Sequence, residues 1–181
     1  MSIKGFTVSG AITIALLGLF PLSGAAQGGL GSLSATGPVL VDGQTASGSV
    51  SLAATNRLAT GDGGGAVVTL ASGGELRLAA QTDAIVSTAG NRLNVHLLCG
   101  EVQLTSTSPA AIISASGGRI TSVSGDSTVV AGGRNERLKR GKSSEFSGNV
   151  MLTAGGAGSS VTVISGRRCD CGCGSAFGGR P

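Results

Sequence analysis

The stretch Arg57–Leu78, RLATGDGGGAVVTLASGGELRL, decides the fold. Apolar side chains occupy every second position from Ala66 to Leu70, and the alternation resumes from Glu75 to Leu78 after the pair Gly73-Gly74. This pattern predicts a strand, a glycine turn and a second strand whose apolar faces share one core. Just before it, Thr60-Gly61-Asp62 and three more glycines predict a tight corner, with the Asp62 carboxylate capping its own glycine turn.

The same alternation recurs in short runs along the chain, separated by Gly, Asn, Asp, Ser or Pro at intervals of about eight to twelve residues. The spacing predicts an all-β fold: a sandwich, a roll or a solenoid-like stack of short strands. No repeat of roughly 20 to 30 residues can be aligned. The remaining expected strands are Pro38–Val41, Ser49–Ala53, Ala84–Ser87, Leu93–Leu98, Glu101–Thr105, Ala110–Ser114, Arg119–Val123, Ser127–Ala131, Asn149–Thr153 and Ser160–Ile164.

The composition fits this fold and limits the function. The 181 residues include 33 Gly, only four Phe and no Trp or Tyr, so the core must consist of Val, Leu, Ile and Ala. Without aromatic side chains there are no stacking platforms for bases or sugars. The net charge of +4 is too thinly spread for a nucleic-acid footprint, and no nucleic-acid partner is expected.

The N-terminus has the pattern of a signal peptide. Lys4 is followed by the uncharged apolar run Ala11–Phe20, by Pro21 and by small residues, which predicts a signal-peptide helix cleaved after Ala26. The apolar run is about half the ~20 residues that a membrane span needs, so a retained anchor is the weaker alternative. Lipid attachment is not expected, because the lipoprotein-like box ends in Ala25 instead of Cys. The chain then divides into a signal peptide (1–26), a flexible lead-in (27–37), a β domain (38–165) and a Gly/Cys-rich tail (166–181).

Several segments of the β domain resemble the FecR-type domain. They are the Gly-Asp corner Leu58–Asp62, the strand and glycine turn Ala66–Gly74, the strand Glu75–Leu78, the segment Leu97–Val102 and the segment Leu138–Lys142. The resemblance covers about residues 38–165. Where the family has an Asp-Gly-Ser turn, this chain has Ser72-Gly73-Gly74, which keeps the turn chemistry without the carboxylate.

The resemblance implies a periplasmic domain that receives a signal from an outer-membrane transporter. In founding members of the family, a cytoplasmic segment ahead of a membrane helix controls a sigma factor. Only about ten residues precede the apolar run in this chain, so the sigma-factor role is not expected to transfer.

Motifs with catalytic associations have simpler explanations. Gly125-Asp126-Ser127 is similar to the nucleophile block of some lipases, but the single histidine, His96, precedes it in the chain; a turn that satisfies its own backbone is expected. Gly141-Lys142-Ser143 lacks the first glycine of a phosphate loop, because Glu136 stands at that position. The nine carboxylates form no pair on one strand face. We therefore expect no enzymatic activity.

A basic cluster is the first candidate binding site. It consists of Arg134, Arg137, Lys139, Arg140 and Lys142 and is tempered by two nearby carboxylates. Such a cluster is most simply a solvated loop. The alternative is a patch for an envelope protein or an anionic polysaccharide, whose binding would weaken as salt is raised.

The cysteines are the second candidate site. Cys169, Cys171 and Cys173 alternate in the tail, and Cys99 follows the expected strand that carries His96. By the parity of that strand, Cys99 is a buried small hydrophobe and His96 faces solvent. The tail cysteines have three interpretations: a silent mobile tail, disulfides with one another, with Cys99 or between chains, and a soft-metal site with thiolates activated by the neighbouring arginines. The usual zinc spacing is absent, and four cysteines allow three full pairings.

Together these patterns predict a periplasmic or secreted, non-enzymatic β domain without a resident cofactor, acting as an envelope scaffold or binding module. The alternatives are a sensing domain that contacts a transporter, and a metal-binding or thiol-redox protein acting through Cys169, Cys171 and Cys173. After signal cleavage no membrane span is expected.

Overall fold

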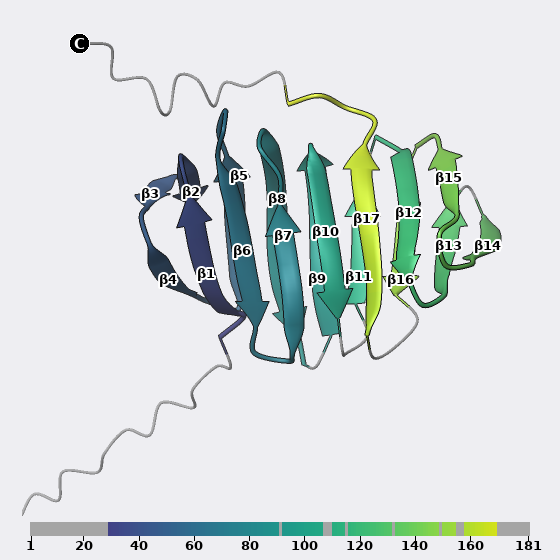
Figure 1. The fold of residues 1–181 in the computed structure, drawn as a ribbon, viewed down its shortest axis with the longest axis horizontal. Helices are drawn as coiled ribbons and strands as arrows, with labels where there is room; N and C mark the ends of the chain where they lie inside the picture. Colours follow the sequence, from purple (N-terminus) through teal and green to yellow (C-terminus); the bar gives the residue numbers. More distant parts are fainter. Residues whose placement is uncertain are drawn as a thin grey trace, which may run out of the picture.

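In the computed structural model, two β-sheets lie face to face (Figure 1). The structure describes residues 29–90, 92–106, 110–114, 116–131, 133–148, 150–154 and 158–169. Within these residues there are seventeen strands and no helix, so the all-β prediction is confirmed in its sandwich form. The expected signal-peptide helix lies outside the described residues.

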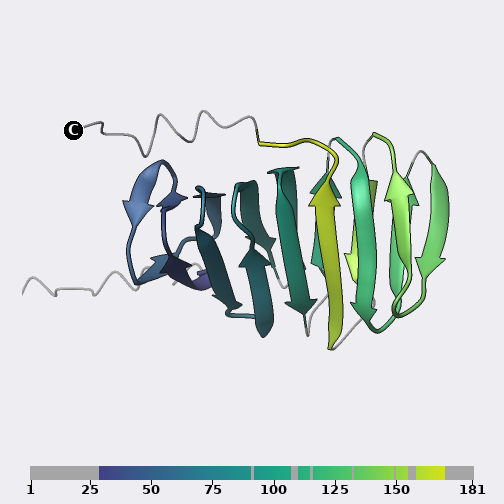
Figure 2. The same cartoon turned by 45° about the horizontal axis from the view of Figure 1, so that its top comes forward.

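Each sheet is long and almost entirely antiparallel. The eight-stranded sheet contains, in spatial order, β15 (Ser143–Phe146), β12 (Gly118–Ser124), β17 (Ser159–Ser165), β10 (Glu101–Ser106), β7 (Gly74–Leu78), β6 (Gly65–Leu70), β1 (Gly31–Thr36) and β4 (Ser49–Leu52). The nine-stranded sheet contains β14 (Arg134–Leu138), β13 (Ser127–Ala131), β16 (Val150–Ala154), β11 (Ala110–Ser114), β9 (Arg92–Cys99), β8 (Thr82–Ala89), β5 (Thr55–Thr60), β2 (Val39–Val41) and β3 (Gln44–Ala46). The chain passes repeatedly between the two layers, which Figure 2 shows from a second angle.

The core lies between the sheets and is almost purely aliphatic. Along β9, Leu93, Val95 and Leu97 are buried while the residues between them are partly exposed, as the period-2 pattern predicts. Complete burial of one such side chain stabilises the fold by about 1.5–3 kcal/mol. Phe146 is partly buried and packs against the edge of this core.

The stretch Arg57–Leu78 forms the predicted hairpin. Strands β6 and β7 pair antiparallel with Val68 opposite Leu76, and the amide of Gly73 donates to the carbonyl of Leu70 at 3.0 Å to close the turn. The corner differs from expectation, because Asp62 accepts a hydrogen bond from the side chain of Gln81 and the Gly64 amide closes the turn onto the carbonyl of Gly61. Asp62 thus links two loops.

The predicted flexible lead-in was wrong for its second half. Residues 31–36 form β1, which lies between β4 and β6 in the eight-stranded sheet. Leu30, just before β1, and Leu33 within it are buried, and their burial offsets part of the entropy cost of ordering a segment rich in Gly and Ser. Strands β3, β5, β14 and β15 also went unpredicted, because their sequences are mostly polar or lie at sheet edges where only one neighbour is needed.

The two ends of the sandwich have the same topology. The order β4-β1-β6 at one end of the eight-stranded sheet corresponds to β15-β12-β17 at the other, and β3-β2-β5 in the nine-stranded sheet corresponds to β14-β13-β16. The six strands β1–β6 thus match β12–β17 in chain order and in position. The structure contains a duplicated unit that the sequence does not reveal.

This internal twofold relationship explains the one parallel pairing among the described strands. A twofold axis normal to the sheets reverses strand direction, so the related strands β8 and β11 run in opposite directions. Strand β9 lies between them and must be antiparallel to one and parallel to the other; it is antiparallel to β8 and parallel to β11.

Equivalent glycines begin the two units. Gly31 starts β1 with φ of 143°, and Gly118 starts β12 with φ of 137°. A Cβ at Gly31 would overlap the carbonyl oxygen of Thr69 in β6, and a Cβ at Gly118 would overlap that of Ile164 in β17. Each glycine lets its strand approach the neighbouring backbone closely.

We predict that Gly118→Ala lowers the free energy of unfolding by more than about 2 kcal/mol, since both the backbone conformation and the overlap oppose a side chain. Gly31→Ala should cause a similar loss. The matched control is Gly65→Ala, where a Cβ would lie 3.6 Å from the nearest atom; its effect should stay within about 0.5 kcal/mol. Urea denaturation measures all three, and equal stabilities of the Gly118 and Gly65 variants would contradict the interpretation.

Candidate functional site

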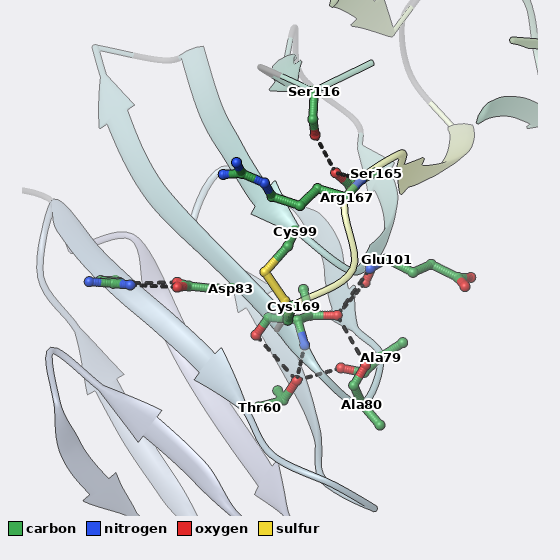
Figure 3. Close-up of a disulfide and its surroundings, with 12 residues drawn as sticks. Thr60, Ala79, Ala80, Asp83, Cys99, Glu101, Ser116, Ser165, Arg167 and Cys169 are labelled. Atoms are coloured by element: carbon green, nitrogen blue, oxygen red, sulfur yellow. Dashed lines mark hydrogen bonds and ion pairs between the residues drawn. A yellow bond between two sulfur atoms is a disulfide. The ribbon is translucent and has the colours of Figure 1, made fainter. Parts of the chain in front are cut away.

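A disulfide joins the two sheets at one rim of the sandwich (Figure 3). Cys99 is the last residue of β9 in the nine-stranded sheet, and Cys169 follows β17 of the eight-stranded sheet. Their Cα atoms are 5.2 Å apart, and the bond spans 70 residues of sequence. Among the pairings that the sequence left open, the fold thus brings Cys169 to Cys99.

Two buried threonines organise the chain around this bond. The Thr60 hydroxyl donates to the carbonyl of Ala79 at 2.6 Å and accepts from the amide of Thr82 at 2.9 Å. The Thr82 hydroxyl and the backbone of Glu101 lie within 3.1 Å and bond to each other. These bonds tie ends of β5, β8 and β10 together beside Cys99 (Figure 3).

The disulfide also changes two of the predictions about single cysteines. Cys99 is buried, with 8 % exposure, but as a disulfide partner and not as a free hydrophobe. Cys169 has no thiol for Arg167 and Arg168 to activate while the bond persists. Cys171 and Cys173 lie outside the described residues. Within the described ones, no group of three or more His, Cys, Asp or Glu side chains is placed to hold a metal ion.

The disulfide lies where the matching half of the fold has a turn. Strand β6 continues through residues 71–73 into β7, and the strands at the corresponding positions in the other half of the sheet are β17 and β10. The end of β17 lies beside the start of β10, but β10 comes earlier in the chain, so no turn can run from β17 into β10. The amide of Ser165 donates to the carbonyl of Gly100 at 2.8 Å, and the Cys99–Cys169 bond supplies the covalent link just beyond.

We predict that the variant Cys99→Ser/Cys169→Ser is less stable by about 2–4 kcal/mol, because the unfolded chain gains the freedom of a long open loop. Reductant should lower wild-type stability to the same level and leave the variant unchanged. The control Cys171→Ser/Cys173→Ser should keep wild-type stability. Urea denaturation, with mass-spectrometric mapping of the unreduced peptides, measures these effects; a different pairing in the map would contradict the assignment.

The basic cluster lies at the opposite narrow end from β3 and β4 (Figure 1). The solvated loop expected there was wrong in part: Arg134 and Arg137 belong to the edge strand β14, and only Lys139–Lys142 form a turn. The strand forms because a tight hairpin folds β14 back on β13, with Ala131 opposite Arg134 and Gly133 at φ of 79°. All five cationic side chains are exposed, as predicted.

The turn connects the two sheets. The amide of Lys142 donates to the carbonyl of Lys139 at 3.0 Å, and Gly141 has φ of 73°, as the third position of a type II turn requires. Lys139, Arg140 and Lys142 therefore project from a single turn. We call Arg134 and these three residues the basic edge.

Ion pairing separates Arg137 from the basic edge. Its guanidinium contacts Asp126 Oδ2 through two nitrogens, at 2.8 and 3.0 Å. Glu136 accepts a hydrogen bond from Ser144 at 3.2 Å. Among the described residues, Arg134, Lys139, Arg140 and Lys142 take part in no salt bridge.

The residues with catalytic associations lie apart. The turn expected at Gly125-Asp126-Ser127 is present, but Asp126 pairs with Arg137 and the Ser127 hydroxyl is buried without a hydrogen-bond partner in the described chain. His96 is on β9, three strand steps from β13 in the same sheet, or about 14 Å. His96 therefore cannot contact Ser127.

Sequence reasoning missed a mostly apolar row on the outer face of the nine-stranded sheet. The row crosses five strands in register and contains Val130, Met151, Ile113, His96 and Ile85. Met151 and Ile113 are 42 % and 36 % exposed. His96, expected to face solvent, is half-buried in this row. The signal was the presence of apolar residues at both parities of β11 and β16.

A shallow hollow of about 460 Å³ opens at the ends of β12, β15 and β17. Its two charged side chains, Arg119 and Glu145, pair with each other at 2.7 Å. Because they neutralise each other, the hollow offers no uncompensated charge to a ligand. The part of the chain that the structure describes contains no helix with the length and hydropathy of a membrane span.

Comparisons with protein-family models, curated proteins and solved structures gave no match. The resemblance to the FecR-type domain therefore stays a prediction from the motifs.

Proposed function

We propose that the chain is an exported, non-enzymatic β domain that serves as a cell-envelope scaffold or binding module. The observation that carries the proposal is the proximity of Cys99 and Cys169 in a disulfide between the two sheets. Structural disulfides persist in oxidising compartments, such as the periplasm and the extracellular space, and are rare in reducing ones. The signal-peptide pattern of residues 1–26 supports the same location.

A sensing domain that contacts a transporter is the second candidate, favoured by the resemblance of residues 38–165 to the FecR-type domain. The thiol or metal function is weaker, because pairing with Cys99 removes Cys169 from the tail and leaves 4 − 2 = 2 cysteines. Structural zinc sites usually use four protein ligands.

We predict that residues 1–26, fused to an alkaline phosphatase that is active only after export, give periplasmic activity in a bacterial host. A charge in the apolar run, Leu16→Arg, should abolish that activity, because export requires an uncharged helix. For the full chain, N-terminal sequencing should find Gln27 first. An unprocessed chain in the membrane fraction would instead show a retained anchor, and cytoplasmic retention of both fusions would contradict export.

A pull-down from envelope extract with the purified chain separates the binding functions. Recovery of a transporter would favour the sensing domain, and recovery of a polysaccharide or another envelope protein would favour the binding module. A truncation that removes residues 170–181 leaves the disulfide in place; loss of function in that variant would favour the thiol or metal alternative.

A further inference from the structure

We propose that the basic edge, Arg134, Lys139, Arg140 and Lys142, binds an acidic polysaccharide. This inference rests on the proposed function as an exported binding module and names its ligand class and contact surface. The first argument is the distribution of charge. Residues 134–142 contain five cations and one carboxylate, 5 − 1 = +4, which equals the formal net charge of the whole chain.

The geometry of the basic edge suits a chain-like ligand. The hydrogen bond from Lys142 to the carbonyl of Lys139 holds three cationic side chains on one turn, with the first and fourth Cα atoms within about 7 Å. Arg134 stands at the other end of β14, four residues before Leu138, or about 13 Å along the strand. The cations are thus spread along the narrow end of the sandwich and are not gathered around one point, where a small anion would bind.

The fold does not neutralise these cations internally. Asp126 is engaged by Arg137, and Glu136 forms no salt bridge with any of the four cations in the described residues. The cations on the turn repel one another, and no salt bridge within the described residues relieves that repulsion. An external polyanion supplies the missing negative charge.

The neighbouring side chains favour a carbohydrate over other polyanions. From residue 133 to residue 145 no aromatic or aliphatic side chain is exposed, because Leu138 is buried. Single-stranded nucleic acids are held largely by stacking of their bases on aromatic side chains, and amphipathic membrane-binding segments insert apolar side chains beside their cations. An acidic polysaccharide can instead be held through its carboxylates, without a stacking platform for its sugar rings. The exposed Asn135 amide is also suited to sugar hydroxyl groups. Individually weak contacts along a polymer add up through multivalency.

The test uses the purified chain and polygalacturonate, a polymer of sugar carboxylates, with neutral dextran as the control polymer. We expect salt-sensitive binding to polygalacturonate and none to dextran. The variant Lys139→Gln/Arg140→Gln/Lys142→Gln should lose affinity by at least about tenfold. The matched control, Arg77→Gln/Arg92→Gln/Arg119→Gln, removes the same charge from other exposed positions and should change affinity by less than about twofold. Thermal melting verifies that both variants fold.

Equal losses in the two variants would overturn the proposal, since they would show dependence on net charge alone. Tighter binding to vesicles of anionic phospholipid, or to DNA, at equal charge concentration would also overturn it, as would an absence of polygalacturonate binding. Failure of the polysaccharide site and failure of the proposed exported function give different results. An exported chain that ignores polygalacturonate but captures an envelope protein keeps the proposed function, whereas a chain that binds polygalacturonate but is not exported keeps only the site.

Discussion

The packing of aliphatic side chains between the two sheets is the constraint on which the structure depends. In the eight-stranded sheet, a fully buried row crosses five neighbouring strands through Leu33, Val68, Leu76, Leu104 and Val161. Because the chain has no Trp or Tyr, such rows must continue through many strands to bury enough area. The glycines that let backbones approach, and the repeated crossing between sheets, serve this continuity.

The alternation of apolar and polar residues predicted those strands whose formation depends on their own sequence. The alternation of Val68 and Leu76 with polar neighbours identified a hairpin and its turn, and the same rule located most central strands. It could not find β14, whose sequence RNERL has one buried side chain, or β1, which is ordered by contacts with strands far along the chain. The duplicated unit was also not recognised from the sequence. Gly31 and Gly118 are equivalent because β1 pairs with β6 as β12 pairs with β17, and not because the residues beside them are alike.

For the candidate sites as well, some features could be predicted from the sequence and others depend on the fold. The exposure of Arg134, Arg137, Lys139, Arg140 and Lys142 followed from composition, but the pairing of Arg137 with Asp126 depends on the β13–β14 register. The disulfide was one of several pairings that sequence allowed. Only the arrangement of the sheets, which brings the end of β17 to the end of β9, brings Cys99 and Cys169 together.

The Cys99–Cys169 bond also determines how the molecule would carry mechanical load. It closes residues 99–169 into a covalent ring that contains β10–β17. Tension applied between the two ends of the chain passes from Cys99 directly to Cys169, so the strands inside the ring are shielded from the pull. Only the strands β1–β9 can be drawn out by such a pull, whereas the segment that carries the basic edge lies inside the ring and cannot be extended while the bond persists.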